Sequence, residues 1–215
     1  MKKLATLSPG QIFNFAGEQF VVLEQRDGAA FVLLAQSKES CPFNDDTNAE
    51  DRNNYNLSTL KKRIDEWVGN LPRNSWEAAA IQEFEVDLNC TDRSGGYGTT
   101  TARAAPLTLW QYGKFKDVIP LHEGSYFWLV TPWACRWLRS PRTSYTSDVW
   151  GVYSNGNCNY YYASVSCGIR PALLLNSDLL VSLDDTVDLS GVCTKDLMAE
   201  IYRRLSTEKG EDDDA

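Results

Sequence analysis

The feature that most restricts the fold is a series of short strand-like segments near the N-terminus. Gln11–Phe15 alternates apolar with polar side chains, and Phe20–Leu23 follows after a short break. Asp27-Gly28 then precedes the apolar segment Ala30–Leu34. A dipeptide of this kind between apolar segments is a strong short-range signal of a β-hairpin. These spacings predict an antiparallel meander over residues 11–36.

Helical periodicity is confined to short segments. Ser58 can cap a helix over residues 59–69, in which Leu60, Ile64, Trp67 and Val68 share one face. Further short helices are expected over residues 75–84, 108–113 and 194–204, and further strands over residues 126–130 and 169–175. Residues 42–56 and the glycine- and threonine-rich residues 90–104 are expected to be loops. Short strands, few helices and long loops predict an α+β fold with a single domain over residues 1–205 and a disordered acidic tail at 206–215.

Charge and length exclude several classes of partner. The chain has 215 residues, of which 43% are hydrophobic, and this is enough for one well-buried core. The formal net charge of −8 repels phosphate backbones and anionic lipids, so we expect no nucleic-acid partner. No apolar stretch approaches the length of a bilayer span, so no membrane insertion is expected. Ser8-Pro9 interrupts the N-terminal apolar residues before a signal peptide can form, and this predicts cytoplasmic synthesis.

Residues able to do chemistry are present but not grouped. The six cysteines lack any CxxC pair, which favours reduced thiols over a disulfide framework and disfavours zinc. They are Cys41, Cys90, Cys135, Cys158, Cys167 and Cys193. His122 is the only histidine and is expected in a surface loop. No nucleophile elbow, P-loop or dinucleotide-binding motif occurs, so we expect no catalytic residues, no metal and no cofactor.

Residues 143–167 form an unusual tract of Tyr, Asn, Ser and Trp with almost no formal charge. Asn155-Gly156 predicts a type I′ turn between strands at Val149–Tyr153 and Asn159–Ala163. The residue types are those of binding surfaces, in which tyrosine supplies rigid contact area and Ser and Asn supply hydrogen bonds. The alternative is a structural hairpin packed on its own core. Because side chains alternate along a strand, the consecutive tyrosines 160–162 cannot all face inward.

Two motifs flank this tract: Trp137-Leu138-Arg139-Ser140-Pro141 before it and Gly168-Ile169-Arg170-Pro171-Ala172-Leu173 after it. With the tract, they resemble the C-terminal half of variable proteins from diversity-generating retroelements, in particular the version found in gut bacteria and their phages. The resemblance implies a C-type-lectin-like fold, which formylglycine-generating enzymes share. It also implies that a reverse transcriptase diversifies AAC codons. Trp150 is the only residue between Arg142 and Cys167 that such codons cannot produce, so it belongs to the scaffold.

The resemblance further implies a ligand-binding variable region at about residues 143–170, held by an invariant frame. The expected contact positions are Tyr145, Ser147, Asp148, Tyr153, Asn157, Asn159, Tyr160, Tyr161, Tyr162, Ser164 and Ser166. The expected frame residues are Trp137, Arg139, Trp150, Gly156, Gly168, Arg170 and Pro171. Arg139 and Arg170 are expected to organise loops by donating hydrogen bonds to carbonyls or carboxylates.

Three functions are compatible with these features. The favoured one is recognition of a protein or another surface ligand, on a phage particle or elsewhere. A structural or virion domain of the same fold without diversification is the second, and an enzyme of the formylglycine-generating type is the least favoured. The Glu-Pro-Asn and Trp-Asn-Asp triplets of calcium-dependent sugar-binding lectins do not occur, so neither calcium nor carbohydrate is implied.

Overall fold

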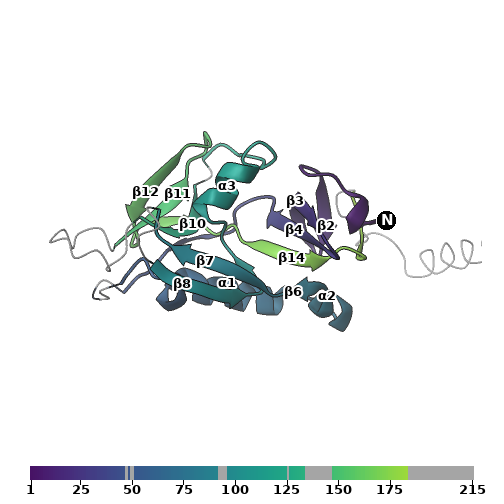
Figure 1. Ribbon diagram of the computed structural model, residues 1–215, viewed down its shortest axis with the longest axis horizontal. Coiled ribbons are helices and arrows are strands. Elements are labelled where there is room, and N and C mark those ends of the chain that lie inside the picture. The colour runs from purple at the N-terminus through teal and green to yellow at the C-terminus, as the bar shows by residue number, and fades with distance from the viewer. Residues whose placement is uncertain (47, 49–50, 92–95, 125, 134–146, 184–215) are drawn as a thin grey trace, which may run out of the picture. The chain divides into compact units, whose positions relative to one another are not determined.

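The computed structural model describes residues 1–46, 48, 51–91, 96–124, 126–133 and 147–183 (Figure 1). Met1–Leu183 is one compact unit, in which the described residues form four sheets and three α-helices. The α+β class is therefore confirmed. The domain boundary expected at residue 205, the helix expected over 194–204 and the acidic tail lie outside the described residues. No helix in the described segments is long and apolar enough to cross a membrane.

The predicted N-terminal meander is confirmed. Strands β2 (Ile12–Phe15), β3 (Glu18–Arg26) and β4 (Ala29–Leu34) pair antiparallel in this order. Ala16 and Gly17 both have positive φ, 52° and 85°, as a two-residue primed turn between β2 and β3 requires. Every residue of β4 is buried, because its other edge pairs with a strand from the far end of the unit.

That strand is β14 (Ala172–Asn176), which lies at the centre of the six-stranded sheet. On its other edge β14 pairs with β6 (Ile81–Gln82) and β9 (Ala104–Ala105). The chain ends of the unit also meet, since β1 (Lys2–Lys3) pairs antiparallel with β15 (Leu180–Val181). A short 3-10 helix, η1 (Leu4–Thr6), leads from β1 toward β2.

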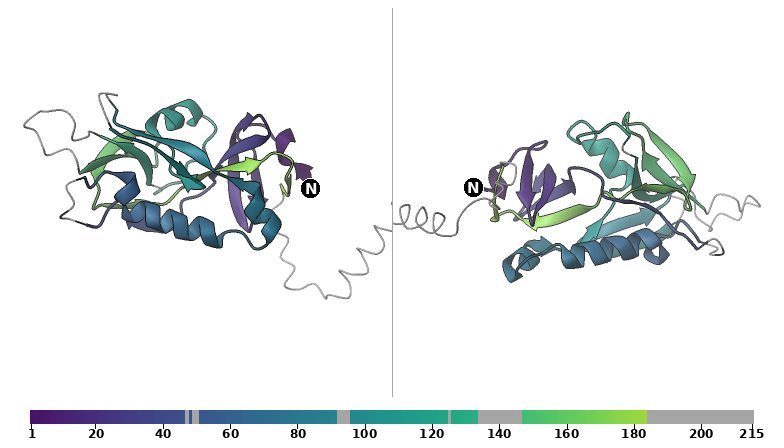
Figure 2. Two further views of the ribbon diagram at one scale, coloured as in Figure 1. Left: turned by 60° about the horizontal axis from the view of Figure 1, so that its bottom comes forward. Right: turned by 180° about the vertical axis from the view of Figure 1, so that it is seen from behind.

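Capping residues mark the starts of the helices, and the cap predicted at Ser58 is confirmed. The Ser58 hydroxyl accepts a hydrogen bond from the Lys61 amide at the start of α1 (Thr59–Asn70), which directly follows the 3-10 helix η2 (Tyr55–Leu57). Leu60, Ile64 and Val68 are buried, as their spacing predicts, and α1 packs along β9 and strand β5 (Ser40–Pro42) (Figure 2). Thr108 and Gln111 form a capping box at α3 (Leu109–Phe115).

Two predictions in residues 75–104 are wrong. The helix expected over 75–84 ends at Ala80 as α2 (Ser75–Ala80), because the next residues pair with β14. The loop expected over 90–104 contains strand β8 (Gly96–Ala102), which pairs with β7 (Phe84–Asn89). The threonine run supplies β-branched side chains suited to a strand, a preference that outweighs the flanking glycines once β7 provides a partner.

The five-stranded sheet positions the tract at 147–167. Its order is β12 (Cys158–Tyr162), β11 (Asp148–Val152), β10 (Phe127–Pro132), β13 (Ser166–Gly168) and β5. Its pairs are antiparallel except β10 with β13. Trp128 of β10 is fully buried, and its indole Nε1 donates a hydrogen bond to the Cys41 carbonyl (2.9 Å). Figure 1 shows the hairpin β11–β12 at the opposite end of the unit from the N-terminal meander.

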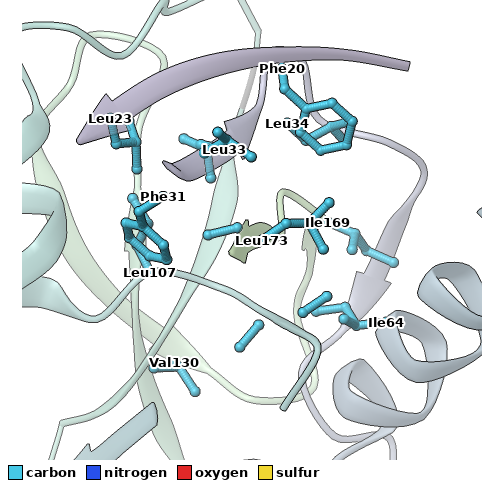
Figure 3. Packing of buried hydrophobic residues seen from close by; sticks show 14 of the residues in the cluster. Phe20, Leu23, Phe31, Leu33, Leu34, Ile64, Leu107, Val130, Ile169 and Leu173 are labelled. Atoms are coloured by element: carbon cyan, nitrogen blue, oxygen red, sulfur yellow. The ribbon is translucent and has the colours of Figure 1, made fainter. Parts of the chain in front are cut away.

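One continuous hydrophobic core joins the sheets and helices. Figure 3 shows side chains from β3, β4, β14, α1 and β10 converging in it, among them Phe20, Leu33, Leu173, Ile64 and Val130. Nearly all strands therefore contribute apolar side chains to the same interior. The hairpin β11–β12 takes part as well, because Val149 and Val152 belong to this core.

The crossover from β13 to β14 carries a buried charge. Arg170 is only 1% exposed, and it donates hydrogen bonds to the carbonyls of Leu34 (2.8 Å), Ala35 (2.6 Å) and Pro120 (2.9 Å). The guanidinium also lies 5.0 Å from the ring centroid of Phe127. Burial lowers the pKa of Arg170 to about 10, so the side chain stays charged at neutral pH. The expectation that Arg170 organises loops through backbone carbonyls is confirmed.

Replacement of Arg170 should therefore weaken the fold strongly. In Arg170→Lys the ammonium cannot reach all three carbonyls, and at least one is left buried without a donor. We expect the free energy of unfolding to fall by about 3 kcal/mol in urea titrations. The matched control is Arg63→Lys on exposed α1 surface, which should change it by less than about 0.5 kcal/mol. Equal stability of the two variants would show that Arg170 does not hold the crossover.

Candidate ligand-binding surface

The predicted hairpin exists, and its turn differs from the expected one. Strands β11 and β12 pair in the register Val149↔Tyr161 and Gly151↔Asn159. The Gly156 amide donates to the Tyr153 carbonyl, and Gly156 alone in this turn has positive φ (83°). The type I′ turn is therefore wrong, because it requires positive φ at two residues. The loop is a three-residue connection in which glycine takes the left-handed position.

The three consecutive tyrosines alternate as the strand period requires. Tyr160 and Tyr162 are 41% and 64% exposed, whereas Tyr161 faces the interior. The Tyr161 ring lies 6.3 Å from that of Trp128 and 5.5 Å from that of Tyr153. It also covers Gly151, where an added Cβ would lie 3.5 Å from the tyrosine ring. Tyr161 thus packs inward and is half-buried, and its expected role as a contact position stays a prediction.

On the outward side, aromatic side chains gather into a surface that we call the aromatic face. It consists of Trp133, Trp150, Tyr160 and Tyr162. The ring of Trp133 lies 4.2 Å from Tyr160 and 4.9 Å from Trp150, measured between centroids. Trp150 and Tyr160 meet edge to face at 6.2 Å. Because the rings support one another, their orientation is set before any ligand arrives.

Hydrogen bonds from neighbouring loops hold the aromatic face in place. The Trp150 indole donates to the Thr91 hydroxyl (2.6 Å). The fully buried Asn53 donates to the Asp148 carbonyl (3.1 Å) and accepts from the Tyr97 hydroxyl (2.7 Å). Sequence reasoning missed Trp133, Asn53 and Tyr97. Trp133 follows directly on an apolar strand, and this position was the one signal that could have revealed it.

The other expected contact positions differ in how exposed they are. Asp148 is 5% exposed, so its expected role as a contact is wrong: it begins β11, where its carbonyl is held by Asn53 and by the Trp133 amide. Burial raises the pKa of its carboxyl group. Ser147, Tyr153 and Asn159 are half-buried, whereas Asn157, Ser164 and Ser166 are exposed. Tyr145, and the frame residues Trp137 and Arg139, lie outside the described residues.

The remaining frame residues are enclosed or sterically restricted. A Cβ on Gly168 would lie 2.7 Å from the Tyr126 carbonyl oxygen, and one on Gly156 would lie 3.0 Å from a Leu121 methyl group. Pro171 is buried, and its carbonyl accepts from the Leu34 amide (3.0 Å). Contacts within the fold therefore restrict the side chain at Gly168 and Gly156 and enclose Pro171, independently of any ligand.

A separate polar cleft of about 330 Å³ lies beside β13 and β5. Its lining includes His122, Glu123, Lys38, Ser166 and Cys167. His122 is exposed in a loop, as expected. Burial raises the pKa of the Cys167 thiol to about 12, the reverse of what a nucleophilic cysteine needs. Among the described residues, no group of three or more His, Cys, Asp or Glu side chains could hold a metal ion.

The two sides of β12 should respond differently to truncation. Tyr161→Ser removes ring contacts with Trp128 and uncovers Gly151, so we expect it to lower the free energy of unfolding by about 2–3 kcal/mol. Tyr160→Ser/Tyr162→Ser removes mostly exposed rings and should cost about 1 kcal/mol. Urea titrations of both variants measure the difference. A double variant that is less stable than Tyr161→Ser would assign the outward rings to the core.

Comparison with known proteins finds a single partial similarity. No curated protein and no solved structure matches the chain. Residues 114–177 match the sequence model of a family described as a domain of unknown function (DUF6273). That segment begins in α3 and ends just after β14, so it contains the aromatic face, the crossover with Arg170 and one side of the polar cleft. Over these residues the chain is similar to the DUF6273 family.

Proposed function

We propose that this protein is a recognition module that binds a macromolecular ligand through the aromatic face. The observation that carries the proposal is the ring cluster of the half-buried Trp133 and Trp150 with the exposed Tyr160, beside the exposed Tyr162. Large aromatic side chains that are at least partly exposed yet held in fixed positions lose little conformational entropy on binding. Residues of this kind dominate the energetics of protein interfaces.

The difference in burial between the two sides of the hairpin supports the same proposal. Tyr161, Val149 and Gly151 occupy the side of the strands that packs inward, whereas Tyr160 and Tyr162 stand on the other side. Substitutions at the outward positions therefore leave the core contacts intact. A surface that tolerates change without loss of the fold suits a protein whose target varies.

We further propose that the fold is C-type-lectin-like and that the region around 143–170 is diversified by a retroelement. Small mixed sheets, flanking helices and long connections agree with that fold. The exposed Asn157, Ser164 and Ser166 are residue types that diversified AAC codons produce. The close packing around Gly168, which leaves no room for a Cβ, and the buried Arg170 fit a frame that must stay constant between variants.

The alternative is a structural domain of the same fold whose hairpin contacts a fixed neighbour in a larger assembly, such as a virion. The exposed aromatic face is compatible with it as well. The enzyme alternative has less support, because the one cysteine in the polar cleft is buried with a raised pKa.

Binding measurements test the recognition surface. Wild-type protein, Tyr160→Ser/Tyr162→Ser and Trp76→Ser are immobilised and incubated with solubilised surface proteins of gut bacteria. Trp76 is the matched control, because it is a 55% exposed aromatic residue on α2 outside the aromatic face. We expect wild type and Trp76→Ser to retain the same bacterial surface protein, and we expect the double variant not to retain it. The Kd for that protein should rise about 30-fold in the double variant, equivalent to about 2 kcal/mol. Equal retention by all three proteins would contradict the proposal.

Sequencing the gene's surroundings tests diversification separately. We expect a nearby reverse-transcriptase gene and a second copy of the codons for residues 143–170, with differences confined to adenines of that copy. A locus without such a copy would support the structural alternative and leave the binding measurement to stand by itself.

A further inference from the structure

Two cysteines far apart in the sequence lie directly opposite each other at the edge of the five-stranded sheet. Cys41 of β5 and Cys167 of β13 are paired residues in an antiparallel ladder. Paired residues of this kind project their side chains to the same face of the sheet. Both thiols are buried, at 6% and 4% exposure. Nothing in the recognition function proposed for the hairpin requires this juxtaposition.

We propose that Cys41 and Cys167 form a disulfide when the protein folds in an oxidising medium. The disulfide would join the edge strand β5 to β13. The pair would then serve as a covalent clasp at the edge of the sheet opposite β12.

The backbone geometry fits the proposal. The Gly168 amide donates to the carbonyl of Tyr126, the residue before β10 (2.7 Å), and so points away from β5. Because the backbone groups of successive strand residues point in opposite directions, those of Cys167 face β5. In such hydrogen-bonded antiparallel pairs the Cα atoms are about 5.5 Å apart. Disulfides span Cα separations of about 4.4–6.8 Å, which includes this value. β5 has three residues and is the edge strand of its sheet, so it can shift slightly to bring the sulfur atoms together.

The reaction is a two-step thiol–disulfide exchange with a low-molecular-weight disulfide such as oxidised glutathione. The thiolate of one cysteine attacks a glutathione sulfur, which forms a mixed disulfide and releases one glutathione thiolate. The second cysteine thiolate attacks the protein sulfur of that mixed disulfide and releases the other glutathione thiolate. Two protein thiols lose two protons and two electrons, and the oxidant is reduced to two glutathione molecules.

Burial governs the rate of this exchange. It raises the pKa of Cys41 to about 11 and that of Cys167 to about 12, so few thiolates exist at neutral pH in the folded protein. Cys167 lines the polar cleft of about 330 Å³, so a small disulfide can approach the pair from this side. We therefore expect slow oxidation of the folded, reduced protein and fast closure during folding.

Peptide mapping tests the pair directly. Full-length protein is refolded with mixed reduced and oxidised glutathione, free thiols are alkylated, and the protein is digested without reductant for mass spectrometry. We expect a cross-linked peptide that joins Cys41 to Cys167 and disappears on reduction. Alkyl label on both cysteines, or a cross-link of either one to another cysteine, would overturn the proposal.

Thermal melts provide the second readout. A disulfide that closes so long a loop should raise the Tm of the refolded wild type by about 5–10 °C relative to the reduced protein. Cys41→Ala/Cys167→Ala should show no such rise, whereas the matched control Cys158→Ala, on half-buried β12, should keep it. Loss of the rise in Cys158→Ala alone would overturn the proposal. If the double variant does not fold, the peptide map of the wild type decides.

Discussion

The rest of the structure depends on the three hydrogen bonds that the Arg170 guanidinium donates to the carbonyls of Leu34, Ala35 and Pro120. Arg170 sits in the crossover that leaves β13 in one sheet and enters β14 in the other. Leu34 ends β4, Ala35 directly follows it, and Pro120 lies after α3, so one side chain ties the crossover to both segments. A buried charge is costly unless it is compensated. Here three carbonyl dipoles and the Phe127 ring compensate the guanidinium, while its Nη1 is buried without a hydrogen-bond partner among the described residues. Arginine suits the place because its planar fork reaches several acceptors at once.

The crossover also positions the hairpin β11–β12. β13 lies parallel to β10, and β10 in turn carries β11 and β12. The fully buried Trp128 anchors β10 to the Cys41 carbonyl on one side and supports the Tyr161 ring on the other. The inward side of the hairpin is thereby committed to the core. Its other side carries the exposed Tyr160 and Tyr162 and the half-buried Trp150, next to Trp133. The proposed recognition surface and the core contacts are thus separated by the two-residue period of a strand.

The five-stranded sheet also keeps the exposed tyrosines and the cysteine pair near opposite edges. β12, with the exposed tyrosines, forms one edge, and β5, with Cys41, forms the other. Three strands lie between them, so a covalent clasp at β5 would strengthen the sheet without touching the aromatic face. The polar cleft opens near the β5 edge and contains His122, Glu123 and Cys167, residues that would attract a catalytic interpretation in isolation. Burial raises the pKa of the Cys167 thiol and so disfavours its reactive thiolate form.

The sequence by itself determined the local elements. The hairpin signal at residues 27–28, the cap at Ser58, and the alternation of Tyr160, Tyr161 and Tyr162 all follow from short-range geometry. Only the tertiary structure decided which distant strands pair. β6 was misassigned because its partner β14 lies far along the chain. β8 was missed although its partner β7 directly precedes it, because its glycines favoured a loop. Asp148 was taken for a ligand contact, and Asn53 and Trp133 were overlooked. Their roles arise from one hydrogen-bonded junction between segments about ninety residues apart, and no window of sequence contains such a junction.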